Sequence, residues 1–394
     1  MIRSIHDKPI DDIQESDLQA LVSSGVPEAR KIEYKLSLPG TTDSEKKEFL
    51  ADVSSFANTS GGVLLYGVRE ENGAAVELVG IPSQNLDQEK LRLESIIRDG
   101  INPRLPVLIQ PIPLANGRIV LLIRVSKSYA APHMVSFKGS SRFYARSSAG
   151  KYQLDFSQLR AAFSASESFG TKARDFRIDR VSKILASDTP VQLRDPPIAV
   201  LHLLPMSAFD LSRLDVSSLA GQSDTLRPLM TYGSYSAPRY NFDGLISHNT
   251  SQGAAESYVQ LFAAGGVIEA VLADLDERVD ANRKFFPITW LEDRLIEELP
   301  RYLQAQASLG VDEPIFMLLS LLGVRGFMMH VENRHRVDQT AIDRDTMLIP
   351  EVLIEDRRIR SEALLRPIFD VIWNAAGWTR SMNYDKDGNR IRRR

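Results

Sequence analysis

The pattern of apolar and polar positions predicts a helix that runs directly into a buried strand near residue 60. Thr42 and Glu45 have the spacing of a capping box, which is typical of the first turn of a helix. Apolar side chains then recur at helical spacing, at Phe49, Val53, Phe56 and Ala57. Residues 63–68 are apolar and bounded by glycine, which favours a strand buried on both faces. Residues 58–62 contain asparagine and glycine, which tolerate the left-handed backbone angles of a tight reversal.

The segments around this helix–strand pair predict a mixed-sheet domain over residues 1–163. A helix lies within residues 11–24, and residues 32–36 alternate as a half-buried strand does, with Glu33 and Lys35 on the polar face. Further along, the pattern predicts a strand near 76–79, a helix near 86–99, paired strands over 105–112 and 118–125, one or two strands within 137–152 and a closing helix over 155–163. The fold class that follows is α/β (α+β).

A second α/β domain is predicted over residues 198–394. Small polar residues at 164–170 predict the end of the first domain, and residues 164–197 then form a linker that contains a basic helix. The second domain has a strand near 198–204, a hairpin of 258–262 with 267–271, and helices over 287–306 and 361–376, with Pro300 as a kink or a break. The tail from Arg380 carries six basic and two acidic residues and is predicted to be mobile.

Composition narrows the possible functions. The chain of 394 residues has no cysteine, which removes disulfides, thiolate metal sites and cysteine nucleophiles and fits a reducing cytoplasm. We find no signal peptide and no membrane-spanning run, so we expect a cytoplasmic protein without a membrane partner. The net charge of −3 argues against nucleic-acid binding over the whole surface but allows a local basic patch.

Acidic residues near the predicted strands form a candidate metal site. Glu28 and Glu33 accompany one predicted strand, and Glu70 and Glu71 follow the next one along the chain. Mg²⁺ binds a few carboxylate oxygens and keeps waters for a phosphate substrate. Lys35, two residues beyond Glu33, can neutralise charge on that phosphate. Spacing alone favours a simpler explanation, in which these acids are solvated charges on an amphipathic strand.

Residues 135–154 carry four basic side chains and no acid: Lys138, Arg142, Arg146 and Lys151. Aromatic side chains are interleaved with them, at Phe137, Phe143, Tyr144 and Tyr152. Basic residues can track a phosphate backbone while exposed aromatics stack on unpaired bases. The candidate nucleic-acid contacts are therefore Lys138, Arg142, Tyr144, Arg146 and Lys151. Strand aromatics are more often core residues, so packing is the alternative for the aromatic half of this pattern.

Motifs in the first domain resemble the AlbA-type domain of the Schlafen proteins, which is often described as a divergent AAA ATP-binding domain. The motifs are Glu33-Tyr34-Lys35, then residues 56–62, then residues 64–68, with a closing strand and helix at 143–148 and 155–159. They follow the family's order within residues 12–163. ATP binding gains no support from the residues, because no Gly-x4-Gly-Lys-Ser/Thr phosphate loop occurs in the chain.

The resemblance implies a nuclease with an acidic metal site. Schlafen nuclease domains cut tRNA and rRNA with three acids, which correspond here to Glu28, Glu33 and either Glu70 or Glu71. By this resemblance these glutamates hold Mg²⁺ or Mn²⁺. The third position departs from the family pattern, which usually has Asp there, whereas in this chain Arg69 follows the strand directly.

Two functions of the first domain remain open from the sequence, and a third possibility is a scaffold whose C-terminal domain senses a phage or cellular ligand or mediates oligomerisation. The first is a divalent-metal-dependent endoribonuclease that acts on tRNA-like RNA, in which Lys35 supports the scissile phosphate, with a role in antiviral defence. Schlafen nuclease cores combine two such halves and this chain has one, so we expect a homodimer or a higher homo-oligomer. The second is a non-catalytic regulator that binds nucleic acid or nucleotide through the same domain, and the departure at Arg69 favours it.

Overall fold

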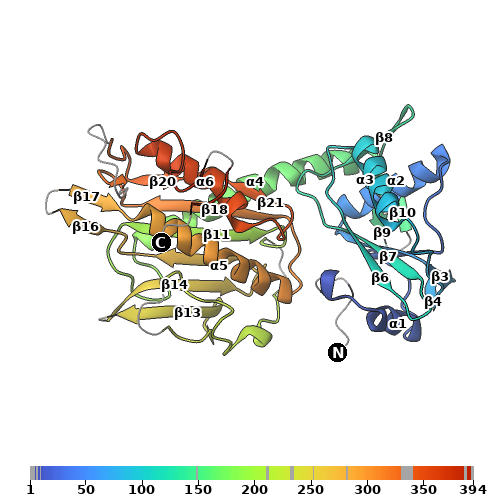
Figure 1. The fold of residues 1–394 in the computed structure, drawn as a ribbon, viewed down its shortest axis with the longest axis horizontal. Coiled ribbons are helices and arrows are strands. Elements are labelled where there is room, and N and C mark those ends of the chain that lie inside the picture. The colour runs from blue at the N-terminus through green and yellow to red at the C-terminus, as the bar shows by residue number, and fades with distance from the viewer. Residues whose placement is uncertain are drawn as a thin grey trace. The chain divides into compact units, whose positions relative to one another are not determined.

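The computed structural model describes residues 5, 8, 10–147, 150–209, 213–230, 235–251, 253–280, 283–329, 340–385 and 388–391. The chain divides into two compact units, Met1–Thr171 and Lys172–Arg394, which run from blue to green and from green to red in Figure 1. Each unit has its own buried core. Within the described ranges, no helix is both long enough and apolar enough to cross a lipid bilayer.

Unit 1 combines a mixed β-sheet with helices, as the sequence predicts. Its helices are η1 (Ile10–Asp12), α1 (Glu15–Ser23), α2 (Asp43–Ala57), α3 (Leu86–Gly100) and the first part of α4 (Phe156–Leu185). Its strands are β1 (Ile32–Lys35), β2 (Gly62–Tyr66), β3 (Val68–Glu71), β4 (Ala74–Leu78), β5 (Ile101–Asn102), β6 (Leu108–Pro113), β7 (Ile119–Val125), β8 (Met134–Phe137), β9 (Ser140–Ser147) and β10 (Gly150–Gln153). One sheet has the order β1-β2-β7-β6, with β1 parallel to β2 and the other pairs antiparallel. A second has the order β10-β9-β8-β5, and β3 pairs with β4 in a hairpin.

The junction of α2 and β2 forms as the sequence predicts. Thr42 caps α2, because its hydroxyl accepts a hydrogen bond from the backbone of Glu45 at 3.3 Å while the Glu45 carboxylate accepts one from the backbone of Thr42 at 3.2 Å. The chain then reverses at Gly61, which has a φ of +69°. A Cβ on Gly62 would lie 2.4 Å from the ring of Phe56, so α2 packs directly on the first residue of β2.

Strand β1 differs from the prediction of a half-buried strand. Glu33, expected on a solvated face, is only 8% exposed. The reason is that Arg146 of β9 bonds to Glu33 and covers its carboxylate, while the same guanidinium lies 3.9 Å from Asp52 of α2. A period of two in the sequence shows that two faces differ in polarity, but it does not show whether the polar face meets water or another charged element.

Helix α4 is continuous where the sequence predicts two separate helices, one closing the first domain at 155–163 and a basic one in the linker. It runs without interruption from Phe156 to Leu185, and the division between the two units falls inside it, after Thr171. Small polar residues do not by themselves stop a helix, and Phe163, just before them, contacts another strand of unit 1. Phe163 lies edge-on to Phe143 of β9 with ring centroids 6.1 Å apart. Contacts of this kind join distant parts of the chain, so the local pattern does not reveal them.

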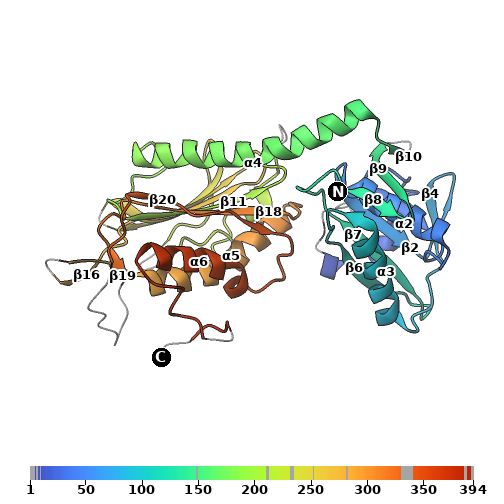
Figure 2. The same ribbon diagram turned by 90° about the horizontal axis from the view of Figure 1, so that it is seen from above.

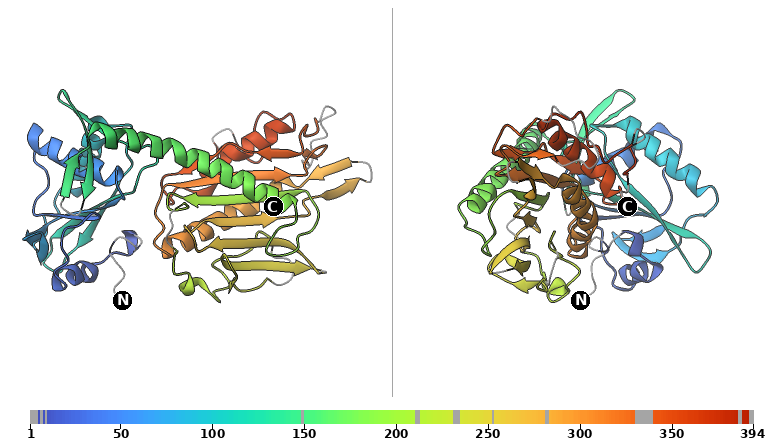
Figure 3. Two further views of the ribbon diagram at one scale, coloured as in Figure 1. Left: turned by 180° about the vertical axis from the view of Figure 1, so that it is seen from behind. Right: turned by 60° about the vertical axis from the view of Figure 1, so that its left-hand side comes forward.

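Unit 2 is built on a large antiparallel sheet of order β12-β13-β14-β15-β11-β18-β20, with β21 also paired to β18. Its strands are β11 (Ile198–Pro205), β12 (Arg239–Tyr240), β13 (Gly244–Ser251), β14 (Ala254–Phe262), β15 (Ile268–Leu272), β16 (Glu277–Asp280), β17 (Arg283–Phe286), β18 (Ile315–Leu322), β19 (Met328–Met329), β20 (Thr346–Leu348) and β21 (Val352–Ile354). Its helices are the last part of α4, η2 (Ser217–Leu219), α5 (Ile288–Ser308) and α6 (Ser361–Ala375). Figures 2 and 3 show α4 on one face of the sheet and α5 with α6 on the other, where the main core lies. Pro300 does not break α5.

The C-terminal tail is docked in the parts that the structure describes, contrary to the predicted mobility. Glu292 of α5 is fully buried and accepts hydrogen bonds from the Ser381 hydroxyl at 3.0 Å and the Asn383 amide at 2.9 Å. Arg390 pairs with the same carboxylate at 2.5 Å and with Asp293 at 2.6 Å. Arg390, one of the basic residues of the tail, therefore serves ion pairs inside unit 2. Residues 386–387 and 392–394 of the tail lie outside the described residues.

Candidate functional site

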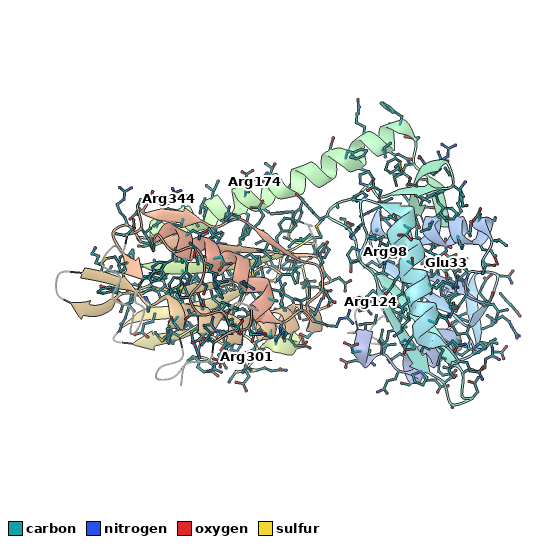
Figure 4. All side chains as sticks on the ribbon, turned by 45° about the horizontal axis from the view of Figure 1, so that its top comes forward. Glu33, Arg98, Arg124, Arg174, Arg301 and Arg344 are labelled. Atoms are coloured by element: carbon teal, nitrogen blue, oxygen red, sulfur yellow. The ribbon has the colours of Figure 1, made fainter. Side chains whose placement is uncertain are left out.

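Glu33 of β1 is the centre of the predicted acidic site, and it is bonded to two cations. The Lys35 ammonium donates to Oε1 at 2.5 Å, and the Arg146 guanidinium of β9 donates to Oε2. Burial alone would raise the pKa of Glu33, but the hydrogen bonds from Lys35 and Arg146 outweigh burial and lower it. Glu33 is therefore ionised and already compensated near neutral pH. Figure 4 labels it among the side chains of unit 1.

Arg146 connects Glu33 to a second acid, Asp52 of α2. The Arg146 side chain is 1% exposed, its Nη1 lies 3.9 Å from Asp52 Oδ1, and its guanidinium carbon lies 4.2 Å from the centre of the Phe56 ring. Lys151 of β10 donates to Asp52 Oδ1 at 2.7 Å and also pairs with Glu48. Burial raises the pKa of Asp52, and the charge of Lys151 offsets only part of that rise.

These contacts form a chain of alternating charges, which we call the ion-pair ladder. Its members, in order of contact, are Lys35, Glu33, Arg146, Asp52, Lys151 and Glu48. The three cations and three anions sum to zero. The middle of the ladder is buried, since the side chains of Arg146 and Asp52 are 1% and 2% exposed, whereas Lys35 at one end is 35% exposed.

The structure brings Glu28 and Glu70 next to this ladder. The Glu28 carboxylate accepts a hydrogen bond from the backbone of Tyr34 at 2.8 Å, and the Glu28 backbone donates to Gly73 at the tip of the β3–β4 hairpin at 2.5 Å. Glu70 accepts from the backbone of the same Gly73 at 2.6 Å. Burial raises the pKa of Glu28, and the negative charges of Glu33 and Glu70 raise it further. Glu71 is exposed on β3. Within the described part of the chain, no hydrogen bond ties it to the group formed by Glu28, Glu33 and Glu70.

The predicted metal ligands Glu28, Glu33 and Glu70 lie near one another but do not form a metal site. Among the described residues, no group of three histidine, aspartate or glutamate side chains is placed to hold a metal ion. Both oxygens of Glu33 are bonded to cations, and an oxygen of Glu28 and one of Glu70 accept backbone hydrogen bonds. In this arrangement the residues do not fit Mg²⁺ or Mn²⁺, which need several free carboxylate oxygens.

The predicted nucleic-acid contacts separate into buried and exposed residues. Arg146 and Lys151 belong to the ladder, and Tyr144 packs against the core of unit 1. Lys138, in the turn between β8 and β9, is 68% exposed and lies 3.8 Å from Asp43. Arg142 of β9 is also exposed. The basic stripe therefore presents two of its four cations to solvent, and the other two neutralise buried acids.

Comparison with known proteins identifies the N-terminal part of the chain. Residues 28–155 match the family model described as Schlafen, AlbA_2. This segment is a Schlafen AlbA_2 domain. The match confirms the resemblance drawn from the motifs, and it contains the whole ion-pair ladder as well as Glu28 and Glu70. None of the curated proteins matches the chain.

Solved structures similar to about a third of this chain include two bacterial proteins. The N-terminal domain of a RecG-related protein from Nitrosomonas europaea is 25% identical, with a TM-score of 0.25, over 32% of this chain and 81% of that one. The DIP2311 protein from Corynebacterium diphtheriae is 17% identical, with a TM-score of 0.25, over 36% of this chain and 26% of that one.

Sequence reasoning missed Asp52 and Glu48 of the AlbA_2 domain. Both lie on α2, and Glu48, Asp52 and Phe56 follow one another at intervals of four residues, which places them on one face of the helix. Asp52 also stands next to Val53 on the predicted buried side. An acid on the apolar face of a predicted helix is a usable signal, because such a carboxylate must find a cation when the face is covered.

Proposed function

We propose that the AlbA_2 domain binds nucleic acid, RNA foremost, through the exposed cations of the β8–β9 hairpin. The observation that carries this proposal is the position of Arg142, which is exposed on β9 and has no ion-pair partner within the described part of the chain. An exposed guanidinium that forms no ion pair is available to phosphate oxygens, which it can bind with two parallel hydrogen bonds. Membership of the Schlafen AlbA_2 family supports the same function.

Lys138 extends this surface to the tip of the hairpin. Its partner Asp43 is itself 60% exposed and lies 3.8 Å away, so the pair is weak and a phosphate can replace the carboxylate. The net charge of −3 limits binding to such a local patch, since the surface as a whole does not attract a polyanion. The proposed interface is therefore small and its affinity depends on salt.

Cleavage of RNA is the second candidate function. The observation that favours it is the grouping of Glu28, Lys35 and Glu70, in which burial raises the pKa of Glu28. A carboxyl group whose pKa lies nearer to neutrality is better suited to general acid–base catalysis. A tRNA substrate, a homodimer and a role in antiviral defence belong to this candidate. The expected dependence on Mg²⁺ or Mn²⁺ does not, because the residues do not fit either ion. A transcriptional regulator without catalysis belongs to the first.

Fluorescence polarisation with labelled tRNA, single-stranded RNA and DNA tests the binding proposal. We expect the double variant Lys138→Ala/Arg142→Ala to bind on the order of tenfold more weakly on every sequence, and its slope of log affinity against log salt to fall by roughly two, because two phosphate contacts are lost. Arg98→Ala is the matched control, since Arg98 is an exposed arginine of the same unit that lies on α3 and pairs with Asp99.

The outcomes separate the two functions. Unchanged affinity and salt slope in the double variant would contradict the proposed interface, and a wild-type protein that binds none of the nucleic acids would contradict nucleic-acid binding altogether. The same mixtures, with and without Mn²⁺, are also run on denaturing gels. Cleavage by the wild type that is lost in Glu28→Gln would establish the second candidate.

A further inference from the structure

Two buried acids of the AlbA_2 domain share a cation that belongs to the protein itself. Glu33 and Asp52 come from different elements, β1 and α2, and the negative charge of Glu33 raises the pKa of Asp52. Two carboxylates in a dry environment need a cation between them, and proteins supply either a metal ion or a basic side chain. Here the guanidinium of Arg146 lies between the two carboxylates.

We propose that Arg146 is the built-in cation of this domain, which takes the place of a divalent metal ion between Glu33 and Asp52 and closes the site to Mg²⁺ and Mn²⁺. The proposal goes beyond nucleic-acid binding and does not depend on it. It accounts for the absence of a three-carboxylate group among the described residues. It also explains why Arg146, one of the four basic residues of the predicted stripe, is buried.

The position of Arg146 is held by its surroundings. Its backbone N–H donates to the Thr59 hydroxyl at 2.9 Å, and β9 pairs with β8 and β10 on either side of it. The guanidinium lies over the Phe56 ring, and Nη1 is held near Asp52 by charge, without a hydrogen bond. A divalent ion that approached the same carboxylates would meet a like charge in a medium of low dielectric constant.

Mn²⁺ binding and thermal unfolding test the proposal without any activity assay. Free Mn²⁺ is measured by electron paramagnetic resonance during titration into the full chain, and the melting temperature is recorded with and without Mn²⁺. For the wild type we expect no saturable binding and no shift in melting temperature. In Arg146→Gln the two carboxylates lose the cation that they share and keep only Lys35 and Lys151 as partners. We therefore expect a melting temperature lower by several degrees that Mn²⁺ partly restores.

Three further variants make the result decisive. Glu33→Gln/Arg146→Gln removes a charge of each sign, so we expect it to be more stable than Arg146→Gln and to lose the response to Mn²⁺. Arg98→Ala is expected to behave as the wild type. Saturable Mn²⁺ binding by the wild type that disappears in Glu33→Gln would overturn the proposal. This comparison does not use Arg146→Gln, so it decides the question even if that variant does not fold, once the melting curve of Glu33→Gln shows a folded protein.

Discussion

At the scale of single residues, burial determines what each charged group does. Glu269 of unit 2 is fully buried on β15 and accepts two hydrogen bonds from Arg180 of α4, both at 2.8 Å, and a third from the Tyr258 hydroxyl at 2.8 Å. The His202 Nε2 lies 2.9 Å from the same carboxylate. Burial alone would raise the pKa of Glu269, but its bonds with Arg180 and His202 outweigh burial and lower it from 4.5 to about 2. Like Glu33, this acid is kept ionised by its partners.

The substitution Glu269→Gln is expected to change the pH dependence of stability. Because the pKa is depressed in the folded state, ionised Glu269 stabilises unit 2 above pH 4.5, and this contribution is lost as the pH falls from 4.5 towards about 2. The variant should be less stable near neutral pH and should lose less stability over that acid window. Urea unfolding at several pH values measures both effects.

Glu351→Gln is the control for this prediction, since Glu351 forms a surface ion pair with Arg174 of the same helix α4, at 3.4 Å. It should leave the pH dependence nearly unchanged, because exposed pairs contribute little. The free energy of unfolding could instead fall equally steeply between pH 4.5 and about 2 in Glu269→Gln and in the wild type. That result would show that the buried carboxylate does not cause the loss of stability in acid.

At the scale of elements, helix α2 positions much of the candidate site. It presents Glu48, Asp52 and Phe56 to the ladder on one face, and its last turn packs on the start of β2. The helix therefore places an acid and an aromatic ring around Arg146, although neither is near Arg146 in the sequence. The start of the helix is set locally by the capping box of Thr42 and Glu45.

Removal of this cap is expected to weaken unit 1. In Thr42→Ala the backbone N–H of Glu45 loses its acceptor, which costs about 1 kcal/mol of unfolding free energy. Thr42→Ser keeps the hydroxyl and should cost less than half as much. Far-UV circular dichroism during urea unfolding gives both values. Equal stability of Thr42→Ala and the wild type would mean that the helix start is held by tertiary packing instead.

At the scale of the whole molecule, two units with separate cores are connected by one continuous helix. The boundary after Thr171 lies within α4, so part of this helix belongs to each core. Phe163 packs in unit 1 against Phe143, whereas Val181 and Ile184 pack in unit 2. Chains with two cores commonly unfold in more than one step.

We expect unfolding to occur in two separable transitions. The three tryptophans, Trp290, Trp373 and Trp378, all belong to unit 2, so their fluorescence reports on that unit, whereas far-UV circular dichroism reports on both. The two signals should not coincide along a urea gradient. Thr42→Ala should shift only the transition of unit 1, which circular dichroism detects and fluorescence does not. Glu269→Gln should shift the transition of unit 2, which fluorescence detects. Coincident curves for both probes would indicate a single cooperative unit.

Most elements of the AlbA_2 domain could be predicted because their signals are local. The periodicity of α2, its cap, the reversal at Gly61 and the β6–β7 hairpin each depend on residues close together in the chain. The candidate site could be predicted only in part. Glu28, Glu33, Lys35 and Glu70 do lie together, but Asp52 was missed and Arg146 was assigned to the surface.

The amino-acid sequence was sufficient to predict most helices and strands of the first domain, the α/β fold class, the absence of cysteine chemistry and the presence of a Schlafen AlbA-type domain. Only the tertiary structure decided which charges are covered and which partners they meet. The bond between Glu33 and Arg146 joins positions 113 residues apart, and that between Asp52 and Lys151 joins positions 99 apart. Alternation and helical spacing act over a few residues, whereas burial and ion pairing depend on which distant element covers a given face. The same basic stripe can therefore bind phosphate or neutralise an acid, and the packing of α2 against β9 decides between them.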